Sequence, residues 1–341
     1  VPFEQRPRLE RRDYIFNAND SYWLTQPAAP LTGYSPLYGP EATARSLRTR
    51  MNVQLLDPDS PYGYAGDDGR FNRREIQEAL FSNRSLAAEL LKGRLVDACR
   101  ATPTITVQGT PEDLTAACDA LAAFNGRLDE DSRGAVLFRE WLTRYDYAEH
   151  FDAGSLFAEP FDAARPVTTP AGLADATLAL EHLAAAVAVL EAAGLPLDAP
   201  LGAAQAAYRA DERFPVHGGN RYEGVANLQV SAKPGAPMLP ADLGHPNGDL
   251  DTTPVADSRL LTASGYPVVH GSSFILTLAF EEDGPVGEAL LTYSQSGDPA
   301  SPWFSDQTAL YRAKTWRPVH FTRDAVEADS RSRRVLRGPR D

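Results

Sequence analysis

The first 194 residues carry a helical pattern. Apolar side chains recur there every three to four positions, which places them on one face of a helix. Asn72 stands three residues before Glu75, as in a capping box, and Ser85 is an N-cap residue type at the start of the next apolar run. The expected helices cover residues 40–56, 72–81, 85–99, 110–124, 132–145 and 174–193.

The pattern changes after Leu195. Runs of β-branched and aromatic residues are broken there by glycine, proline and asparagine, which predicts strands. Thr277 to Phe280 and Leu290 to Tyr293 are largely apolar on both faces, so we expect inner strands that are covered on both sides. One more helix is expected at residues 305–314. Residues 330–341 contain five arginines and are expected to be a solvated tail.

This segregation of helices and strands indicates an α+β fold rather than a doubly wound α/β sheet. A length of 341 residues exceeds the usual size of a single hydrophobic core, so two packed units are expected. The pattern divides the chain into a strand-and-turn segment at 1–39, a mostly helical region at 40–194, a mostly β region at 195–322 and an arginine-rich tail at 323–341.

The net charge of the chain argues against some classes of binding partner. Thirty-three basic and 46 acidic residues give a net charge of −13, which repels phosphate, so neither nucleic acid nor an anionic membrane is expected as a partner. The longest strongly apolar stretch, Leu183 to Leu190, is far shorter than the roughly 20 residues that cross a bilayer. The first residues are charged from the fourth position and include no initiator methionine. We therefore expect a processed or excised piece of a longer protein, without a signal peptide.

The common catalytic motifs are missing from the sequence. It contains no G-x-S-x-G elbow, H-E-x-x-H, phosphate-binding loop or C-x-x-C motif. The six histidines never approach metal-ligand spacing, and the acidic segment DPDSPYGYAGDDG places proline and glycine where a calcium loop needs ligands. We expect no metal and no cofactor.

Two cysteines, Cys99 and Cys118, lie in consecutive expected helices. A hairpin of helices could bring them together, and a disulfide closing a loop of this size would stabilise the fold by about 3 kcal/mol. Two buried thiols would fit the same spacing, so spacing alone leaves both possibilities open.

The segment FNANDSYW, residues 16–23, follows a short apolar and aromatic run. Asparagine and aspartate side chains bond to their own backbone, so Asn17, Asn19 and Asp20 indicate a turn that ends a strand. The open question is whether one of these carboxamides also takes part in chemistry.

Arg48 occupies an unusual position on the expected helix at 40–56. Ala44, Leu47, Met51 and Leu55 form one apolar stripe, and Arg48 falls at its edge, whereas Arg50 points the other way. An unpaired buried guanidinium is costly, so Arg48 must either extend along the apolar surface to water or meet a polar partner.

Long blocks of the sequence carry a family resemblance. FNANDSYW is followed by QPAAPLTGYSPLYGP, RTRMNVQLL, AGDDGRFNRREIQ, ACDALAAFNGRLDEDSRGAVLFREW, HGGNRY and LTYSQSGDPASPWFSDQTALY. From about Arg6 to Thr322, these blocks resemble the later part of the β-chain of the penicillin acylase family, which are N-terminal-nucleophile hydrolases. The resemblance implies part of an αββα sandwich with a largely helical insertion.

The resemblance also implies a mechanism that needs no histidine. The family's nucleophile is a serine at the start of the β-chain, and its base is that serine's own α-amino group, with a pKa of about 8. The tetrahedral intermediate is held by backbone N–H and an asparagine carboxamide. On the pattern N-x-N-D-S that asparagine corresponds to Asn19. A family arginine precedes a stretch ending in two leucines, here Leu55 and Leu56, which selects Arg48 to orient Asn19 and the α-amino group.

This chain departs from the family because Val1 is not a nucleophile. The family serine lies upstream, so we expect this chain to be inactive alone and to work with the remaining β-chain portion and the α-chain. A non-catalytic binding or scaffolding fragment of the same fold is the alternative.

The resemblance suggests a substrate and a compartment. The substrate would be a small-molecule amide between a fatty or aryloxyalkyl acyl chain and a polar amine, as in a lipopeptide, a penicillin or an acyl-homoserine lactone. Members of the family are exported, which implies a secreted or periplasmic protein and favours the disulfide between Cys99 and Cys118.

Overall fold

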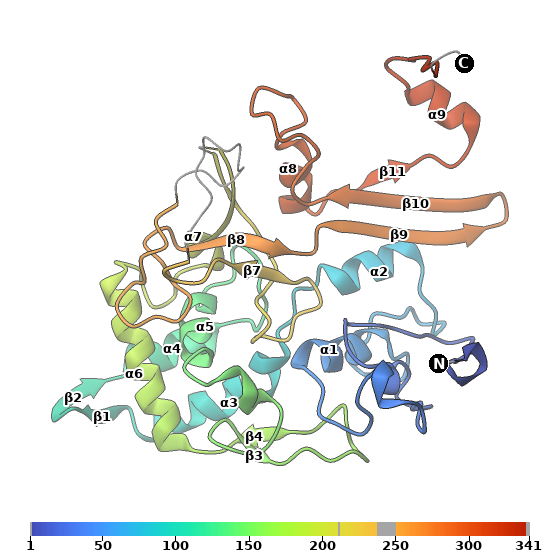
Figure 1. Ribbon diagram of the computed structural model, residues 1–341. Helices are drawn as coiled ribbons and strands as arrows, with labels where there is room; N and C mark the ends of the chain where they lie inside the picture. Colours follow the sequence, from blue (N-terminus) through green and yellow to red (C-terminus); the bar gives the residue numbers. More distant parts are fainter. Residues whose placement is uncertain (1, 211, 237–249, 339–341) are drawn as a thin grey trace.

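The computed structural model describes residues 2–210, 212–236 and 250–338. The fold is α+β, as expected, with helices α3 to α6 gathered together and a long β9–β10 hairpin extending away from them (Figure 1). The α-helices are α1 Leu47–Leu56, α2 Arg73–Leu80, α3 Leu86–Ala101, α4 Thr115–Ala123, α5 Ala135–Leu142, α6 Ala176–Ala192, α7 Leu201–Ala204, α8 Asp306–Arg312 and α9 Arg323–Asp329.

Several expected helix boundaries are confirmed. The Asn72 side chain accepts a hydrogen bond from the Glu75 backbone N–H at 3.0 Å, and the Glu75 carboxylate accepts from the Asn72 N–H at 2.8 Å, which completes the capping box of α2. Ser85 caps α3 by accepting from the Ala88 N–H. Gly194, with φ of +66°, follows the end of α6.

The expected helix from Pro40 is wrong over its first two turns, because α1 begins only at Leu47. Gly39 and Ala42 have positive φ values of 135° and 49°, which a right-handed helix does not allow. The Ser46 side chain then accepts a hydrogen bond from the Thr49 N–H and caps α1.

The helix expected to begin at Thr110 is also wrong at its start. Thr110–Asp113 is strand β2, which pairs antiparallel with β1, Thr104–Val107, and α4 begins only at Thr115. Gln108 and Gly109 join the strands with positive φ values of 50° and 86°, as in a two-residue hairpin turn. The pair Thr110 and Pro111, which predicted a helix N-terminus, therefore begins an edge strand.

Four sheets are present in the described residues. The larger two have the strand orders β6-β5-β8-β7 and β11-β10-β9, and only β5 and β8 pair in parallel. The remaining strands form the hairpins β1-β2 and β3-β4. The bounds not yet given are β3 Phe157–Glu159, β4 Ala171–Leu173, β5 Gln205–Arg209, β6 Glu212–Pro215, β7 Gln229–Ser231, β8 Tyr266–Gly271, β9 Phe274–Glu281, β10 Gly284–Leu291 and β11 Arg317–Val319.

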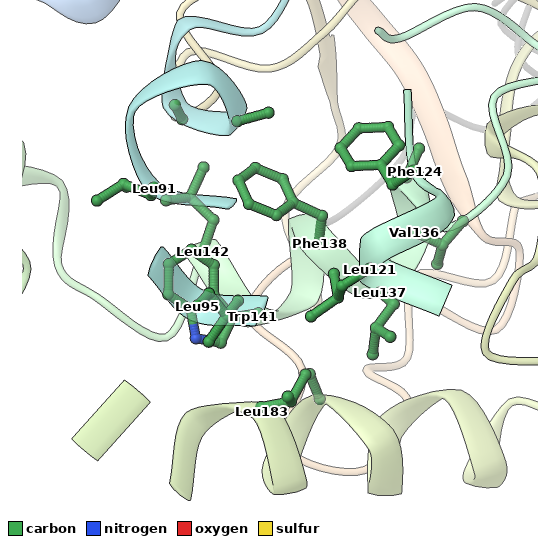
Figure 2. Close-up of a cluster of buried hydrophobic side chains, with 14 of the residues drawn as sticks. Leu91, Leu95, Leu121, Phe124, Val136, Leu137, Phe138, Trp141, Leu142 and Leu183 are labelled. Atoms are coloured by element: carbon green, nitrogen blue, oxygen red, sulfur yellow. The ribbon is translucent and has the colours of Figure 1, made fainter. Parts of the chain in front are cut away.

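The main core lies between the helices. Figure 2 shows Phe138 and Trp141 of α5 between Leu91 and Leu95 of α3 and Leu183 of α6, and all five side chains are fully buried. Burying each of these side chains contributes about 1.5–3 kcal/mol. Cys99 at the end of α3 and Cys118 in α4 form a disulfide, which joins two of the helices that enclose this core. In the described residues, no helix is both long and apolar enough to span a bilayer.

Strand β9 differs from the prediction of an inner strand covered on both sides. Ile275 and Thr277 face the protein and are buried, and Gln77 of α2 donates a hydrogen bond to the Thr277 hydroxyl at 2.9 Å. The other face carries only apolar side chains, and they are 42–82% exposed: Phe274, Leu276, Leu278 and Phe280. The prediction fails for β9 because it is an edge strand with no second layer on this face in the described part of the chain. We call these four residues the β9 face.

Candidate functional site

The asparagine turn is built by its own side chains. The Asn17 carboxamide oxygen accepts a hydrogen bond from the Asn19 backbone N–H at 2.8 Å, so Asn17 stabilises the turn. Asn19 has a φ of +57°, in the left-handed region, which asparagine tolerates better than most residues. The turn interpretation of the sequence thus holds for the backbone.

Asp20 ties this turn to the start of α1. Its carboxylate accepts hydrogen bonds from Arg45 Nη1 at 2.8 Å and from the Thr49 hydroxyl at 2.9 Å. Arg45 is buried, donates its second Nη to the Pro40 carbonyl at 2.7 Å and stacks 5.2 Å from the Trp23 ring. Sequence reasoning missed this ion pair because it placed Arg45 inside a helix. The acidic residue directly after Asn19 was the available signal.

Arg48 contacts Asn19 directly. Its Nη2 donates to the Asn19 carboxamide oxygen at 3.1 Å and also to the Ala18 carbonyl. A guanidinium only donates hydrogen bonds, so the Asn19 oxygen must face Arg48 and the NH₂ group must point away from it. Asn19 is exposed, and none of the described residues accepts a hydrogen bond from this NH₂ group. The geometry therefore presents a fixed, unused N–H donor.

Arg48 and Arg50 both lie on α1, but their surroundings differ. Arg50 points into the protein, where its Nε donates to the Val167 carbonyl at 2.8 Å and its Nη1 to the Pro170 carbonyl at 3.0 Å. Complete burial lowers the pKa of Arg50 to about 10. Partial burial also lowers the pKa of Arg48, while Tyr147 and Asp20 oppose that shift. Of these two arginines, only Arg48 contacts Asn19.

Aromatic and cationic side chains continue the site beyond Arg48. Burial raises the pKa of Tyr147, and the charges of Arg221 and Arg48 oppose the rise. Gly224, two residues after Tyr222, packs closely against Leu47, the residue before Arg48. The Arg221 guanidinium carbon lies 4.9 Å from the centre of the Tyr147 ring and 5.4 Å from that of Tyr222. The two tyrosine rings meet edge to face at 5.4 Å. Sequence reasoning gave these residues no role, although Arg221 and Tyr222 stand in the block HGGNRY that carries the family resemblance. Their contact with Tyr147 depends on tertiary packing.

Other polar groups of the molecule are buried and paired away from this site. Arg139 forms a two-point ion pair with Glu223, with N–O distances of 2.7 and 3.0 Å. His217 accepts at Nδ1 from the carboxamides of Asn83 and Asn227, both at 3.1 Å. No group of three or more His, Cys, Asp or Glu side chains in the described residues is arranged to hold a metal ion.

The site thus consists of a carboxamide donor on a rigid turn, oriented by an arginine from the following helix, in an α+β fold. The chain belongs to the penicillin amidase family, whose sequence profile matches residues 1–328.

Two curated relatives show how far this similarity extends. The chain is 37% identical over 325 residues to aculeacin-A acylase of Actinoplanes utahensis, covering 94% of this chain and 36% of that protein. It is 30% identical over 343 residues to the acyl-homoserine lactone acylase PvdQ of Pseudomonas putida, covering all of this chain and 38% of that protein. The chain therefore spans little more than a third of the length of these relatives.

A solved structure is also similar, at a lower level. A thermostable penicillin G acylase from Alcaligenes faecalis aligns with 94% of this chain and 56% of its own, with a TM-score of 0.42 and 14% sequence identity.

Proposed function

We propose that this chain is part of an amidohydrolase that cleaves the amide between a fatty or aryloxyalkyl acyl chain and a polar amine. The observation that carries the proposal is the Asn19 carboxamide, whose oxygen is held by Arg48 and whose NH₂ group is exposed without a partner among the described residues. Both curated relatives are named acylases, which supports the same reaction class.

In this proposal, the hydroxyl of a serine outside the chain attacks the amide carbonyl carbon and gives its proton to that serine's own α-amino group, which later passes the proton to the leaving amine. The carbonyl oxygen becomes negatively charged in the tetrahedral intermediate, and the Asn19 Nδ2–H donates a hydrogen bond to it. The intermediate collapses to an ester on the serine and releases the amine, which takes up a proton. Water then attacks the ester by the same route and releases the acid.

Arg48 is a positioning residue in this mechanism. It fixes the Asn19 carboxamide by its hydrogen bond at 3.1 Å, so that the donor does not have to be oriented during the reaction. Its positive charge also strengthens the polarity of the carboxamide. The clamp of Arg45 and Thr49 on Asp20 holds the turn that carries Asn19.

We propose that the partner of the chain is the remaining part of the same polypeptide. The β9 face exposes four large apolar side chains, and water-exposed patches of this kind mark interaction surfaces. This chain covers little more than a third of the relatives, so their length leaves room for a segment that covers the face. An exported protein is favoured by the disulfide between Cys99 and Cys118.

The test compares the isolated 341-residue chain with the longer protein, that is, the full polypeptide of which we propose the chain is a part. Both are assayed with octanoyl, decanoyl and phenoxyacetyl amides of one amine, and intact mass after brief exposure to substrate locates the acyl ester. We expect turnover only with the longer protein and an acyl adduct outside this chain. Hydrolysis by the isolated chain, or binding of acyl amides by the longer protein without turnover, would contradict the proposal. The second result would favour the scaffolding alternative.

A further inference from the structure

A pocket of about 380 Å³, lined by both apolar and polar residues, opens beside the loop that carries Arg221 and Tyr222. It is lined by residues from the loop before β7, from β7 and the residues that follow it, and from the loop before β8. A volume of this size lies within the range of small-ligand sites. The polar groups in its wall are Asn220, Arg221, Ser231, Lys233, Ser258 and Arg259.

The loop that carries Arg221 connects this pocket to α1. Gly224 of this loop packs closely against Leu47, the residue before Arg48, and Arg48 holds the Asn19 carboxamide. In the same loop, Arg221 packs on the Tyr147 ring at 4.9 Å. Arg221 and Tyr222 are themselves part of the pocket wall. The pocket therefore belongs to the loop that packs on α1, the helix whose Arg48 holds Asn19.

The pocket is rich in positive charge, in contrast to the molecule as a whole, whose net charge is −13. Arg221, Lys233 and Arg259 all line it. Arg259 is engaged by Asp146 at 2.7 Å. Arg221 packs between two tyrosine rings, and no carboxylate of the described residues lies within ion-pair distance of it. A guanidinium in this situation is suited to bind a carboxylate from a ligand.

Two buried polar atoms of the pocket wall lack hydrogen-bond partners among the described residues. They are the carboxamide oxygen of Asn220 and the hydroxyl oxygen of Ser231, in residues that are only 3% and 5% exposed. A buried polar group without a partner costs about 1–3 kcal/mol, so such groups are usually satisfied by a ligand or by water. The Asn220 oxygen can accept from an N–H or O–H group, and the Ser231 hydroxyl can donate to an oxygen.

We propose that this pocket binds the amine half of the substrate and that this amine carries a carboxylate, as an amino acid or short peptide does. The inference rests on the proposed function, because it assigns the leaving amine of that reaction. Arg221 binds the carboxylate, with Lys233 adding positive charge, and the Ser231 hydroxyl and Asn220 oxygen bond to the neighbouring polar groups of the same amine.

The experiment compares two substrates of nearly equal shape in the longer protein. N-octanoylglycine carries a carboxylate, and N-octanoylglycinamide carries a neutral carboxamide at the same place. We expect the unaltered protein to prefer the carboxylate at least tenfold in kcat/KM, and Arg221→Gln to reduce that ratio to near one. Arg74→Gln is the matched control, since Arg74 is an exposed arginine on α2 that pairs with Glu78. It should preserve the ratio.

The ratio of the two kcat/KM values distinguishes a carboxylate-binding role of Arg221 from a purely structural one. If Arg221 only supported the two tyrosines, its substitution would slow both substrates equally and leave the ratio unchanged, which would overturn the inference. Lack of preference in the unaltered protein would overturn it as well, while leaving the proposed function intact.

A binding measurement tests the pocket even if the proposed function is wrong. If neither compound is hydrolysed, calorimetric titration with each one still tests the pocket. Tighter binding of N-octanoylglycine that is lost in Arg221→Gln would support the pocket alone, and equal binding of the two compounds would overturn it.

Discussion

The helical region buries its apolar side chains, whereas the β9 face exposes them to solvent. Between α3, α5 and α6, apolar side chains such as Trp141 and Leu183 are fully buried, and even the Arg139 and Glu223 charges are enclosed and paired. On the β9 face, Phe280 is 82% exposed. The exposed carboxamide of Asn19 is likewise left with an unused donor.

This difference indicates which parts of the chain are complete in themselves. The helical region satisfies its apolar surface and its buried charges with residues of the same chain. The β9 face and the Asn19 turn present groups that gain a partner only from outside the described residues. The following substitutions test this contrast between a closed region and an open one.

The largest effect on stability is expected at the ion pair of the closed region. Arg139→Met leaves the fully buried Glu223 carboxylate without its cation and should cost about 3–5 kcal/mol in unfolding free energy. Arg74→Met is the control at an exposed pair with Glu78 and should cost below about 1 kcal/mol. Denaturant titration measures both. Equal costs would show that Arg139 and Glu223 are not enclosed as described.

The open region is tested by two positions on opposite faces of β9. Ile275 is buried within this chain, whereas Leu278, on the β9 face, is 42% exposed. If the remaining polypeptide covers this face, Leu278→Ser should destabilise the longer protein by roughly 1.5–3 kcal/mol, as Ile275→Ser does. A change within about 0.5 kcal/mol for Leu278→Ser alone, the usual result for a surface site, would argue that the face is uncovered.

A pH effect is expected from His217, which is buried against Phe81 and Tyr311. Burial lowers the pKa of His217 to about 4, against its ordinary 6.5, and its Nδ1 faces two carboxamide donors that a proton would oppose. The Lys314 charge lowers this pKa further, while the Tyr311 carbonyl, which accepts from Nε2 at 2.8 Å, and Asp129 oppose the shift.

Because the folded-state pKa is depressed, the stability from neutral His217 is present above pH 6.5 and is lost as the pH falls toward 4. Between pH 7 and pH 5 the loss should be roughly 2 kcal/mol. In His217→Gln, this part of the pH dependence of the unfolding free energy should disappear. An unchanged pH profile would contradict the buried, neutral histidine.

A smaller effect is expected at Arg48, which acts through Asn19. Arg48→Leu should lower kcat about tenfold, equivalent to 1.4 kcal/mol, and leave KM nearly unchanged, because the carboxamide loses its orientation but not its donor. Arg48→Lys keeps a positive donor and should recover part of kcat. A rise in KM with constant kcat would instead indicate that Arg48 binds the substrate.

The sequence predicts local features of this molecule better than distant contacts. The capping box of Asn72 and the end of α6 depend on neighbouring residues, and both are confirmed. The predicted helix starts at Pro40 and Thr110 were wrong. Residues with positive φ and the pairing of β2 with β1 exclude a helix there, whatever the apolar periodicity. The division into four segments at residues 39, 194 and 322 stays a prediction.

The same limit applies to the candidate site. Asn19 and Arg48 were selected from a family resemblance, and Arg48 also from its place on a helix, and the structure brings these two side chains into contact. Their catalytic roles stay predictions. The ion pair of Arg45 with Asp20 and the contact of Tyr147 with Arg221 join residues far apart in the sequence, so periodicity contains no signal for them.

Turnover of Asn19→Asp in the longer protein tests the central claim most directly. Aspartate keeps the shape of the side chain and an oxygen for Arg48, and it tolerates the left-handed backbone, but it has no N–H to donate. Asn17→Asp, which retains the oxygen that accepts from the Asn19 N–H, is the control and should keep near-normal turnover. The account predicts that Asn19→Asp lowers kcat by about 10² to 10³, the usual cost of one oxyanion donor, with an unchanged melting temperature. A loss of less than tenfold would contradict it.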